Sequence, residues 1–257
     1  MRRGTIDTGR RGMRNGGGVG EVVVPRTIKL VDSLSSANYY QLASSSGVPG
    51  SAAMTVMTVL YCKKTSPLNA DFTPITKFTN NTRGYRLRVI QGADRVVPAA
   101  VNGSATTVSE TVSQAGYELG KFYTFGMRIT GGLLEAFFQG SQIGAPGATL
   151  TGYTAATTAD TLQVGLASAA ANWALAAVVV ADTTAVSNAN ITAWHAQVAA
   201  SNSFSFPGGG TTALWYAGDA DAGAGVAAAT WTDSVGGIVL AKAATPTITT
   251  ITSPVFA

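Results

Sequence analysis

The residues that could carry acid–base or nucleophilic chemistry are few in this sequence and stand apart from one another. Glu110, Glu118 and Glu135 lie in different predicted turns or strands, and Glu135 is interpreted as a solvated carboxylate. The single histidine, His195, has no cysteine or carboxylate spaced to assist it. Catalytic and metal sites need several such groups within reach of one another. The sequence therefore predicts a protein that is not an enzyme.

Three aspartates in the C-terminal part of the chain are the candidates for a cation site. They are Asp219, Asp221 and Asp233. Ca²⁺ is bound by oxygen ligands, so a cluster of these carboxylates could hold it. The alternative, which we favour, is that Asp219 and Asp233 make hydrogen bonds within turns. We therefore expect no metal or other cofactor, and keep calcium only as a weak candidate.

Aromatic side chains are the candidates for contact with a sugar. A sugar site needs aromatic platforms with polar neighbours on an accessible face. By residue type alone the candidates are Trp173, Trp215, Tyr216 and Trp231. The alternative is that these residues belong to the core, which is the commoner place for aromatic residues in strands.

Positive charge is concentrated at the N-terminus. Residues 1–29 hold seven basic and two acidic residues, which leaves +5, whereas the rest of the chain sums to −1. The arginines of this arm that we expect to anchor it are Arg2, Arg3, Arg10, Arg11 and Arg14. With so little apolar surface, the arm should be disordered in isolation and anchor to another subunit. Nucleic acid is the less favoured partner because no aromatic residue is present to stack on bases, and a solvated tail is the third alternative.

The stretch from Lys121 to Ile143 predicts the central hairpin of a β-sandwich. Tyr123, Phe125, Met127 and Ile129 alternate with small or polar residues, which indicates a strand with one buried face. Gly131-Gly132 can supply the positive φ angles of a tight hairpin turn, and the returning strand, 133–138, is apolar on both faces. Strands are also predicted at 54–61, 85–90 (with Arg86 and Arg88 outward), 162–166 and 173–180. One helix is predicted over 183–200, capped by Ser187, with Ile191, Trp194 and Val198 on one face.

Composition supports a soluble all-β protein. The chain has 257 residues, 46% of them hydrophobic and only 12% charged, and is rich in the small residues that suit strands and turns. The single cysteine, Cys62, excludes an internal disulfide. No apolar run follows the first arginines, so no secretory signal is expected. The uncharged stretch 164–181 contains polar residues and alanines, and is interpreted as buried strands rather than a membrane span.

The order of these elements resembles a known family. A strand containing Tyr-Arg-Leu-Arg-Val precedes Gly-Lys-Phe-Tyr-Thr-Phe-Gly-Met-Arg-Ile, and Leu-Glu-Ala-Phe-Phe-Gln-Gly and Leu-Gln-Val-Gly follow. Over residues 33–202 this resembles the laminin-G-like branch of the concanavalin A-like lectin/glucanase superfamily. The resemblance implies a two-sheet antiparallel jelly roll with one short helix, flanked here by extended N- and C-terminal arms. The Glu-x-Asp-x-Glu strand of the glucanase members is absent, which agrees with a non-enzymatic role.

A second resemblance concerns the C-terminal part of the chain. Leu214, Trp215, Asp219, Trp231, Asp233, Gly236 and Pro246 match a segment that often neighbours such domains in bacterial and phage surface proteins. Because few residues follow Pro246, we expect this segment to pack on the preceding domain or on a neighbouring chain. Its tail, 245–255, suits strand addition to an exposed sheet edge. The predicted organisation is an arm (1–29), a sandwich (30–203), a linker (204–212) and a C-terminal segment (213–257).

Two functional classes follow from these features. The first is a structural protein of a bacteriophage virion, such as a capsid decoration or other surface component, assembled in the host cytoplasm and anchored by its arm. Its partners would be other virion or capsid subunits, within a homo-oligomer, and neither a membrane nor nucleic acid. The alternative is a carbohydrate-binding adhesion module, as in a tail fibre or a cell-surface lectin, whose partners would be cell-surface glycans. We prefer the first class, since fold alone does not fix function.

Overall fold

The computed structural model describes most of the chain beyond the N-terminal arm. The described residues are 25–42, 51, 53–63, 71–79, 82–90, 95–113, 116–155, 160–167, 172–182, 184–244 and 246–257. The five arginines predicted to anchor the arm lie outside this set. No helix among the described residues has the length and apolar character needed to cross a bilayer.

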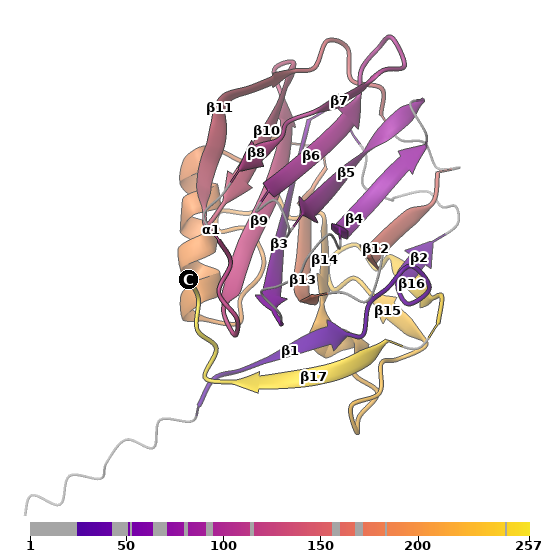
Figure 1. The fold of residues 1–257 in the computed structure, drawn as a ribbon, viewed down its shortest axis with the longest axis vertical. Helices are drawn as coiled ribbons and strands as arrows, with labels where there is room; N and C mark the ends of the chain where they lie inside the picture. Colours follow the sequence, from indigo (N-terminus) through magenta and orange to yellow (C-terminus); the bar gives the residue numbers. More distant parts are fainter. Residues whose placement is uncertain are drawn as a thin grey trace, which may run out of the picture.

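Two antiparallel sheets pack face to face, so the predicted all-β sandwich is confirmed (Figure 1). The first sheet has eight strands in the order β11-β10-β9-β3-β13-β1-β17, with β14 also paired to β13. Its strands are β1 (Thr27–Asp32), β3 (Met54–Cys62), β9 (Phe122–Thr130), β10 (Leu133–Phe138), β11 (Ser141–Thr149), β13 (Trp173–Ala181), β14 (Ala213–Tyr216) and β17 (Thr247–Thr252).

The second sheet has nine strands in the order β15-β16-β2-β12-β4-β5-β6-β7, and β8 pairs with β6. Its strands are β2 (Tyr40–Leu42), β4 (Asp71–Thr79), β5 (Arg83–Ile90), β6 (Arg95–Val101), β7 (Thr107–Ser109), β8 (Val112–Ser113), β12 (Leu162–Ala167), β15 (Thr230–Thr232) and β16 (Val239–Lys242). The helices are α1 (Asn188–Ala200) and the short 3₁₀ helix η2 (Ala217–Ala220).

The central hairpin forms where the sequence predicts it. Strands β9 and β10 are joined by Gly131 and Gly132, whose φ angles of 55° and 78° are those of a tight hairpin turn. The register pairs Thr130 with Leu133, and Ile129 with Leu134. Strand β9 also pairs with β3 along its length, so the hairpin is an interior part of the sheet.

The prediction that β9 buries only one face is wrong, because a second layer covers the other. The face with Phe125 and Met127 points into the core between the sheets. The opposite face, which includes Phe122, is covered by α1, the element standing beside the eight-stranded sheet in Figure 1. Every residue of β9 except the last is therefore buried.

Helix α1 agrees with its prediction in cap and face. The Ser187 side chain accepts a hydrogen bond from the Asn190 backbone N–H, which satisfies one of the free donors of the first turn. Ile191, Trp194 and Val198 are buried against the sheet. A helix this short is stable mainly because its apolar face is packed.

The segment predicted as a linker, 204–212, is part of this second layer. Phe204 and Phe206 are buried in the same cluster as the helix residues. The indole N–H of Trp194 donates to the Phe204 carbonyl oxygen over 2.6 Å. The linker prediction fits only the glycines that follow, Gly208 to Gly210, which all have positive φ.

The C-terminal segment packs on its own sandwich. Strand β14 pairs with β13, while β15 and β16 extend the nine-stranded sheet. The predicted strand addition occurs within the chain, since β17 pairs with β1 over six residues. Because β1 begins at Thr27, the last residues of the predicted arm belong to the sandwich.

The outer face of the central hairpin contains a buried ion pair between Arg128 and Glu135. These residues are directly opposite across the hairpin, and their side chains make two hydrogen bonds of 2.6 and 3.0 Å. Arg128 also donates to the Val186 carbonyl and lies over the Phe137 ring. The interpretation of Glu135 as a solvated carboxylate is wrong, since only 4% of the residue is exposed.

We predict that Glu135→Ala destabilises the protein by about 3–5 kcal/mol, because it leaves the Arg128 charge buried without its partner. The measurement is the free energy of unfolding in urea. The double variant Arg128→Met/Glu135→Leu is the control and should recover most of the loss, since it removes both charges together. A loss below about 1 kcal/mol in Glu135→Ala would show that this pair is not needed.

His195 gives a second prediction, on the pH dependence of stability. Its Nδ1 lies 2.9 Å from the Thr124 hydroxyl, and burial lowers its pKa below the ordinary value of 6.5. As the pH falls through 6.5, the unfolded chain binds a proton before the folded chain does, so the free energy of unfolding decreases. Because the chain has one histidine, His195→Gln should remove this decrease. The measurement is the free energy of unfolding in urea between pH 7.5 and 5.5, about one unit either side of the ordinary pKa. An equal decrease of this free energy in both proteins would contradict the prediction.

Candidate functional site

The root of the N-terminal arm is fixed by Arg26. Its guanidinium donates to the backbone carbonyl oxygens of Val198 and Ala199 over 2.6 and 2.7 Å, and also to that of Ser201. Its Nε–H donates to the side-chain amide oxygen of Asn202 over 2.7 Å. These acceptors lie at the C-terminal end of α1, where free carbonyls and the helix dipole favour a cation. Burial lowers the pKa of Arg26, yet an arginine stays charged at neutral pH.

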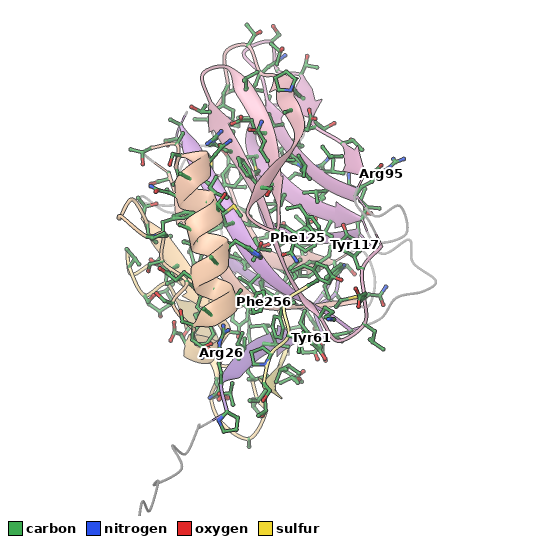
Figure 2. All side chains as sticks on the ribbon, turned by 90° about the vertical axis from the view of Figure 1, so that its left-hand side faces the viewer. Arg26, Tyr61, Arg95, Tyr117, Phe125 and Phe256 are labelled. Carbon is green, nitrogen blue, oxygen red and sulfur yellow. The ribbon has the colours of Figure 1, made fainter. Side chains whose placement is uncertain are left out.

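The C-terminus of the chain closes over the same point. The centroid of the Phe256 ring lies 5.6 Å from the Arg26 guanidinium carbon. The same ring stacks on that of Phe122, with the two centroids 5.2 Å apart. The Ser253 N–H donates to the Arg26 carbonyl over 2.8 Å. Figure 2 shows Arg26 and Phe256 on the side of the molecule where the helix lies. We call Arg26, the end of α1 and Phe256 the arm clamp.

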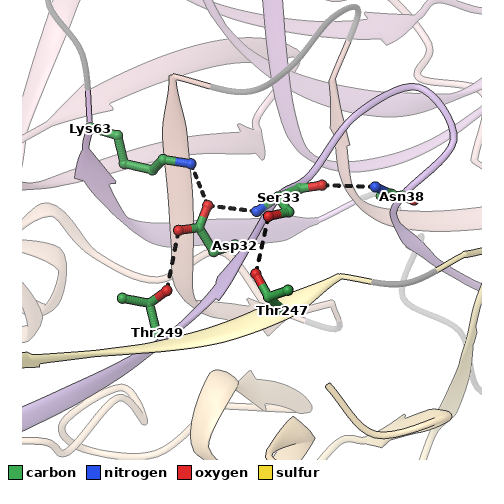
Figure 3. Close-up of polar contacts among 6 residues, drawn as sticks. All are labelled: Asp32, Ser33, Asn38, Lys63, Thr247 and Thr249. Carbon is green, nitrogen blue, oxygen red and sulfur yellow. Dashed lines mark hydrogen bonds and ion pairs between the residues drawn. The ribbon is translucent and has the colours of Figure 1, made fainter. Parts of the chain in front are cut away.

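A polar network around Asp32 fixes the strands next to the clamp (Figure 3). The Asp32 carboxylate pairs with the Lys63 ammonium and accepts from the Thr249 hydroxyl over 3.2 Å. The Ser33 and Thr247 hydroxyls lie 3.1 Å apart. These contacts join β1 to β17 by side chains as well as by the backbone. Lys29, also on β1, pairs with Asp221 and strengthens the same region.

The tryptophans predicted as sugar platforms are not accessible. Trp173, Trp215 and Trp231 are completely buried. Trp173 lies in a cluster of aromatic rings. The centroids of the Trp173 and Tyr117 rings are 5.0 Å apart, in an edge-on arrangement. The core alternative is therefore confirmed for these three residues. Tyr216 is half-buried, with its ring stacked on Phe204.

The three aspartates proposed as weak calcium ligands are used in different ways. Asp233 is buried and accepts hydrogen bonds from the backbone N–H groups of Leu214, Val235, Gly236 and Ile238. This is the favoured alternative, a carboxylate that holds a turn. Asp221 is paired with Lys29, which lowers the pKa of the carboxyl, whereas burial raises the pKa of Asp219. In the part of the chain that the structure describes, no group of three or more such ligands forms.

A cleft that the sequence did not reveal opens on the outer face of the nine-stranded sheet. Its volume is about 380 Å³. The residues that line it are Ser36, Asp71, Thr73, Arg86, Arg88, Leu166 and Ala167. Arg88 pairs with Asp71 inside it. The sequence predicted that Arg86 and Arg88 point outward, and this is confirmed, but the other residues come from distant segments.

Comparisons with known proteins found weak structural matches. No protein-family model matches the chain, and no curated protein matches it. The heptameric SAP-like pentraxin from Limulus polyphemus matches with a TM-score of 0.46 and 16% identity, over 65% of this chain and 81% of the pentraxin. The binding domain of botulinum neurotoxin serotype G matches with a TM-score of 0.41 and 11% identity, over 67% and 44%. Mouse laminin α1 domains LG4-5 match with a TM-score of 0.40 and 13% identity, over 55% and 34%.

The chain spans less than half the length of the toxin and laminin chains. With identities of 16% or less and TM-scores below 0.5, the matches carry no inference about a ligand or a partner.

We predict that Asp233→Ala lowers the free energy of unfolding by about 2–4 kcal/mol, because four backbone donors lose a charged acceptor. Asp219→Asn, in the same region, should change it by less than about 1 kcal/mol. Thermal unfolding tests the calcium hypothesis directly. We expect the same midpoint temperature with millimolar CaCl₂ and with EDTA. A midpoint temperature that calcium raises and magnesium does not change would contradict the expectation that these aspartates bind no calcium.

Proposed function

We propose that the chain is a non-enzymatic structural protein of a bacteriophage virion, a capsid decoration or other surface component that assembles in the host cytoplasm. Its basic N-terminal arm would anchor it to neighbouring subunits, and its sandwich would face outward. The observation that carries the proposal is the arm clamp at Arg26. Because Arg26 is held by these contacts, the arm leaves the sandwich at a fixed position, which a role in anchoring requires.

Charge supports the division between arm and body. Arg26 and Lys29 are used by contacts within the sandwich. The remaining basic residues of the arm are five arginines, against Asp7 and Glu21. Residues 30–257 sum to −1. A positive arm on a weakly negative body favours contact between the arm of one subunit and an acidic surface of another.

The ion pairs support a role without catalysis. In the described part of the chain, the carboxylates of Asp32, Asp71, Glu135, Asp160 and Asp221 are each held by a basic side chain. Hydrolysis of a glycoside requires two carboxyl groups that flank one bond. These five carboxylates are instead committed to holding the fold.

The second candidate is a carbohydrate-binding adhesion module. It loses three of its four aromatic candidates to burial. The feature that favours it is the open cleft beside Arg86. The two functions are compatible, because a surface component can be anchored by its arm and bind a glycan through its outward face.

Removal of residues 1–24 tests the proposal, since this cut leaves Arg26 and β1 intact. We expect the truncated protein to be a folded monomer, and the full chain to form a defined oligomer in light scattering. Higher salt should weaken that oligomer, because screening reduces the attraction of exposed charges. An antibody against the sandwich should also label intact phage particles in electron microscopy.

Two variants separate charge from length. Replacing Arg2, Arg3, Arg10, Arg11 and Arg14 by glutamine keeps the arm and removes its arginine charge, and should abolish the oligomer. Arg95→Gln, on an exposed strand residue outside the arm, is the matched control and should leave it unchanged. A full chain that is monomeric at every salt concentration, with no labelling of particles, would refute the proposal.

A further inference from the structure

The cleft on the nine-stranded sheet is lined by an arginine, Arg86, with one unpaired donor. Arg86 is half-buried, and among the described residues its Nε–H has no hydrogen-bond partner. No ion pair of Arg86 is found there either, and Asp71 is paired with Arg88. Burial, and then the charge of Arg88, lowers the pKa of Arg86, whereas the charge of Asp71 raises it by less, and the group remains protonated at neutral pH. A buried donor without a partner is unfavourable, and an acceptor from a ligand or from water satisfies it.

The guanidinium is held in place by an aromatic ring. Its central carbon lies 4.8 Å from the centre of the Phe78 ring, a cation–π contact. A planar guanidinium fixed in this way can bind the two oxygens of one carboxylate or sulfate. The ring beneath it is covered by Arg86, so Phe78 does not offer that face for stacking on a base or a sugar.

The surroundings of Arg86 offer groups that bind hydroxyls. Register places Gln41 opposite Gln163, Gln163 opposite Thr76, and Thr76 opposite Arg86. Directly paired residues share a face of the sheet, so amide, hydroxyl and guanidinium groups form one polar row across four strands. The hydroxyl residues Ser36 and Thr73 line the cleft itself.

The charge of the cleft selects a ligand with a single negative charge. Arg86 and Arg88 against Asp71 leave one net positive charge among the lining residues. Binding of single-stranded nucleic acid combines phosphate contacts with aromatic stacking, and the described residues that line the cleft include no aromatic side chain. The combination of one anion and several hydroxyl-binding groups fits an acidic sugar.

We infer that the cleft beside Arg86 binds a monoanionic saccharide, with the carboxylate or sulfate on the guanidinium and the sugar hydroxyls toward the polar row. This site is independent of the assembly role proposed above. It also differs from the aromatic platforms expected from the sequence, because recognition is by charge and hydrogen bonds.

The test uses the full chain and four small probes: galacturonate, N-acetylneuraminate, galactose 6-sulfate and uncharged galactose. Arginine Nε–H resonances in ¹H–¹⁵N NMR spectra report directly on Arg86. We expect saturable shifts of the Arg86 signal with at least one acidic sugar, and binding at least about tenfold weaker for galactose. Sodium acetate and sodium sulfate, as anions without a sugar, should bind at least about fivefold more weakly than that acidic sugar.

Arg86→Gln should lower the affinity for the acidic sugar at least about tenfold. Arg95→Gln removes the same charge from an exposed position outside the cleft and should leave the affinity within about twofold. Unfolding midpoints of both variants check that the fold is intact. The inference is wrong if none of the acidic sugars saturates the Arg86 signal, if both variants weaken binding equally, or if acetate and sulfate bind as well as the sugars.

Discussion

The structure depends on the burial of the β9–β10 hairpin on both faces. One face of the hairpin packs against the second sheet, and the other is covered by α1 and by Phe204 and Phe206. The outer face also contains the ion pair of Arg128 and Glu135, whose burial is tolerable only because the two charges satisfy each other. This second layer fixes the position of the helix, and the C-terminal end of the helix in turn holds Arg26. The arm clamp is thus a consequence of how the central hairpin is covered.

The two faces of the sandwich are consequently different. The eight-stranded sheet is covered by the helix and its flanking segments, whereas the outer face of the nine-stranded sheet has a largely half-buried polar row and a cleft. Arg26, where the arm joins the sandwich, lies at the C-terminal end of α1, on the side of the eight-stranded sheet. The cleft lies on the other sheet. A subunit held by its arm can therefore leave the cleft accessible. This arrangement makes the proposed anchoring role and the inferred sugar site compatible in one molecule.

Local patterns in the sequence predicted the local features well. Two consecutive glycines between alternating strands gave the hairpin turn, and Ser187 ahead of Ile191 and Trp194 gave the helix and its cap. Contacts between distant segments were not readable in this way. The burial of the tryptophans depends on which face each strand turns inward, and the cleft combines residues from four separate segments. Glu135 was within reach of prediction, because the predicted turn places it opposite Arg128.

The central claim is that the basic arm contacts a neighbouring subunit. Replacing Met13, in the arm, by a photoreactive amino acid tests this claim directly in the assembled full-length protein. After irradiation, mass spectrometry of mixed light and ¹⁵N-labelled chains distinguishes links between subunits from links within one. The account predicts that mixed light–heavy links from the arm dominate and disappear at high salt. Links confined to a single chain, or to none, would contradict it.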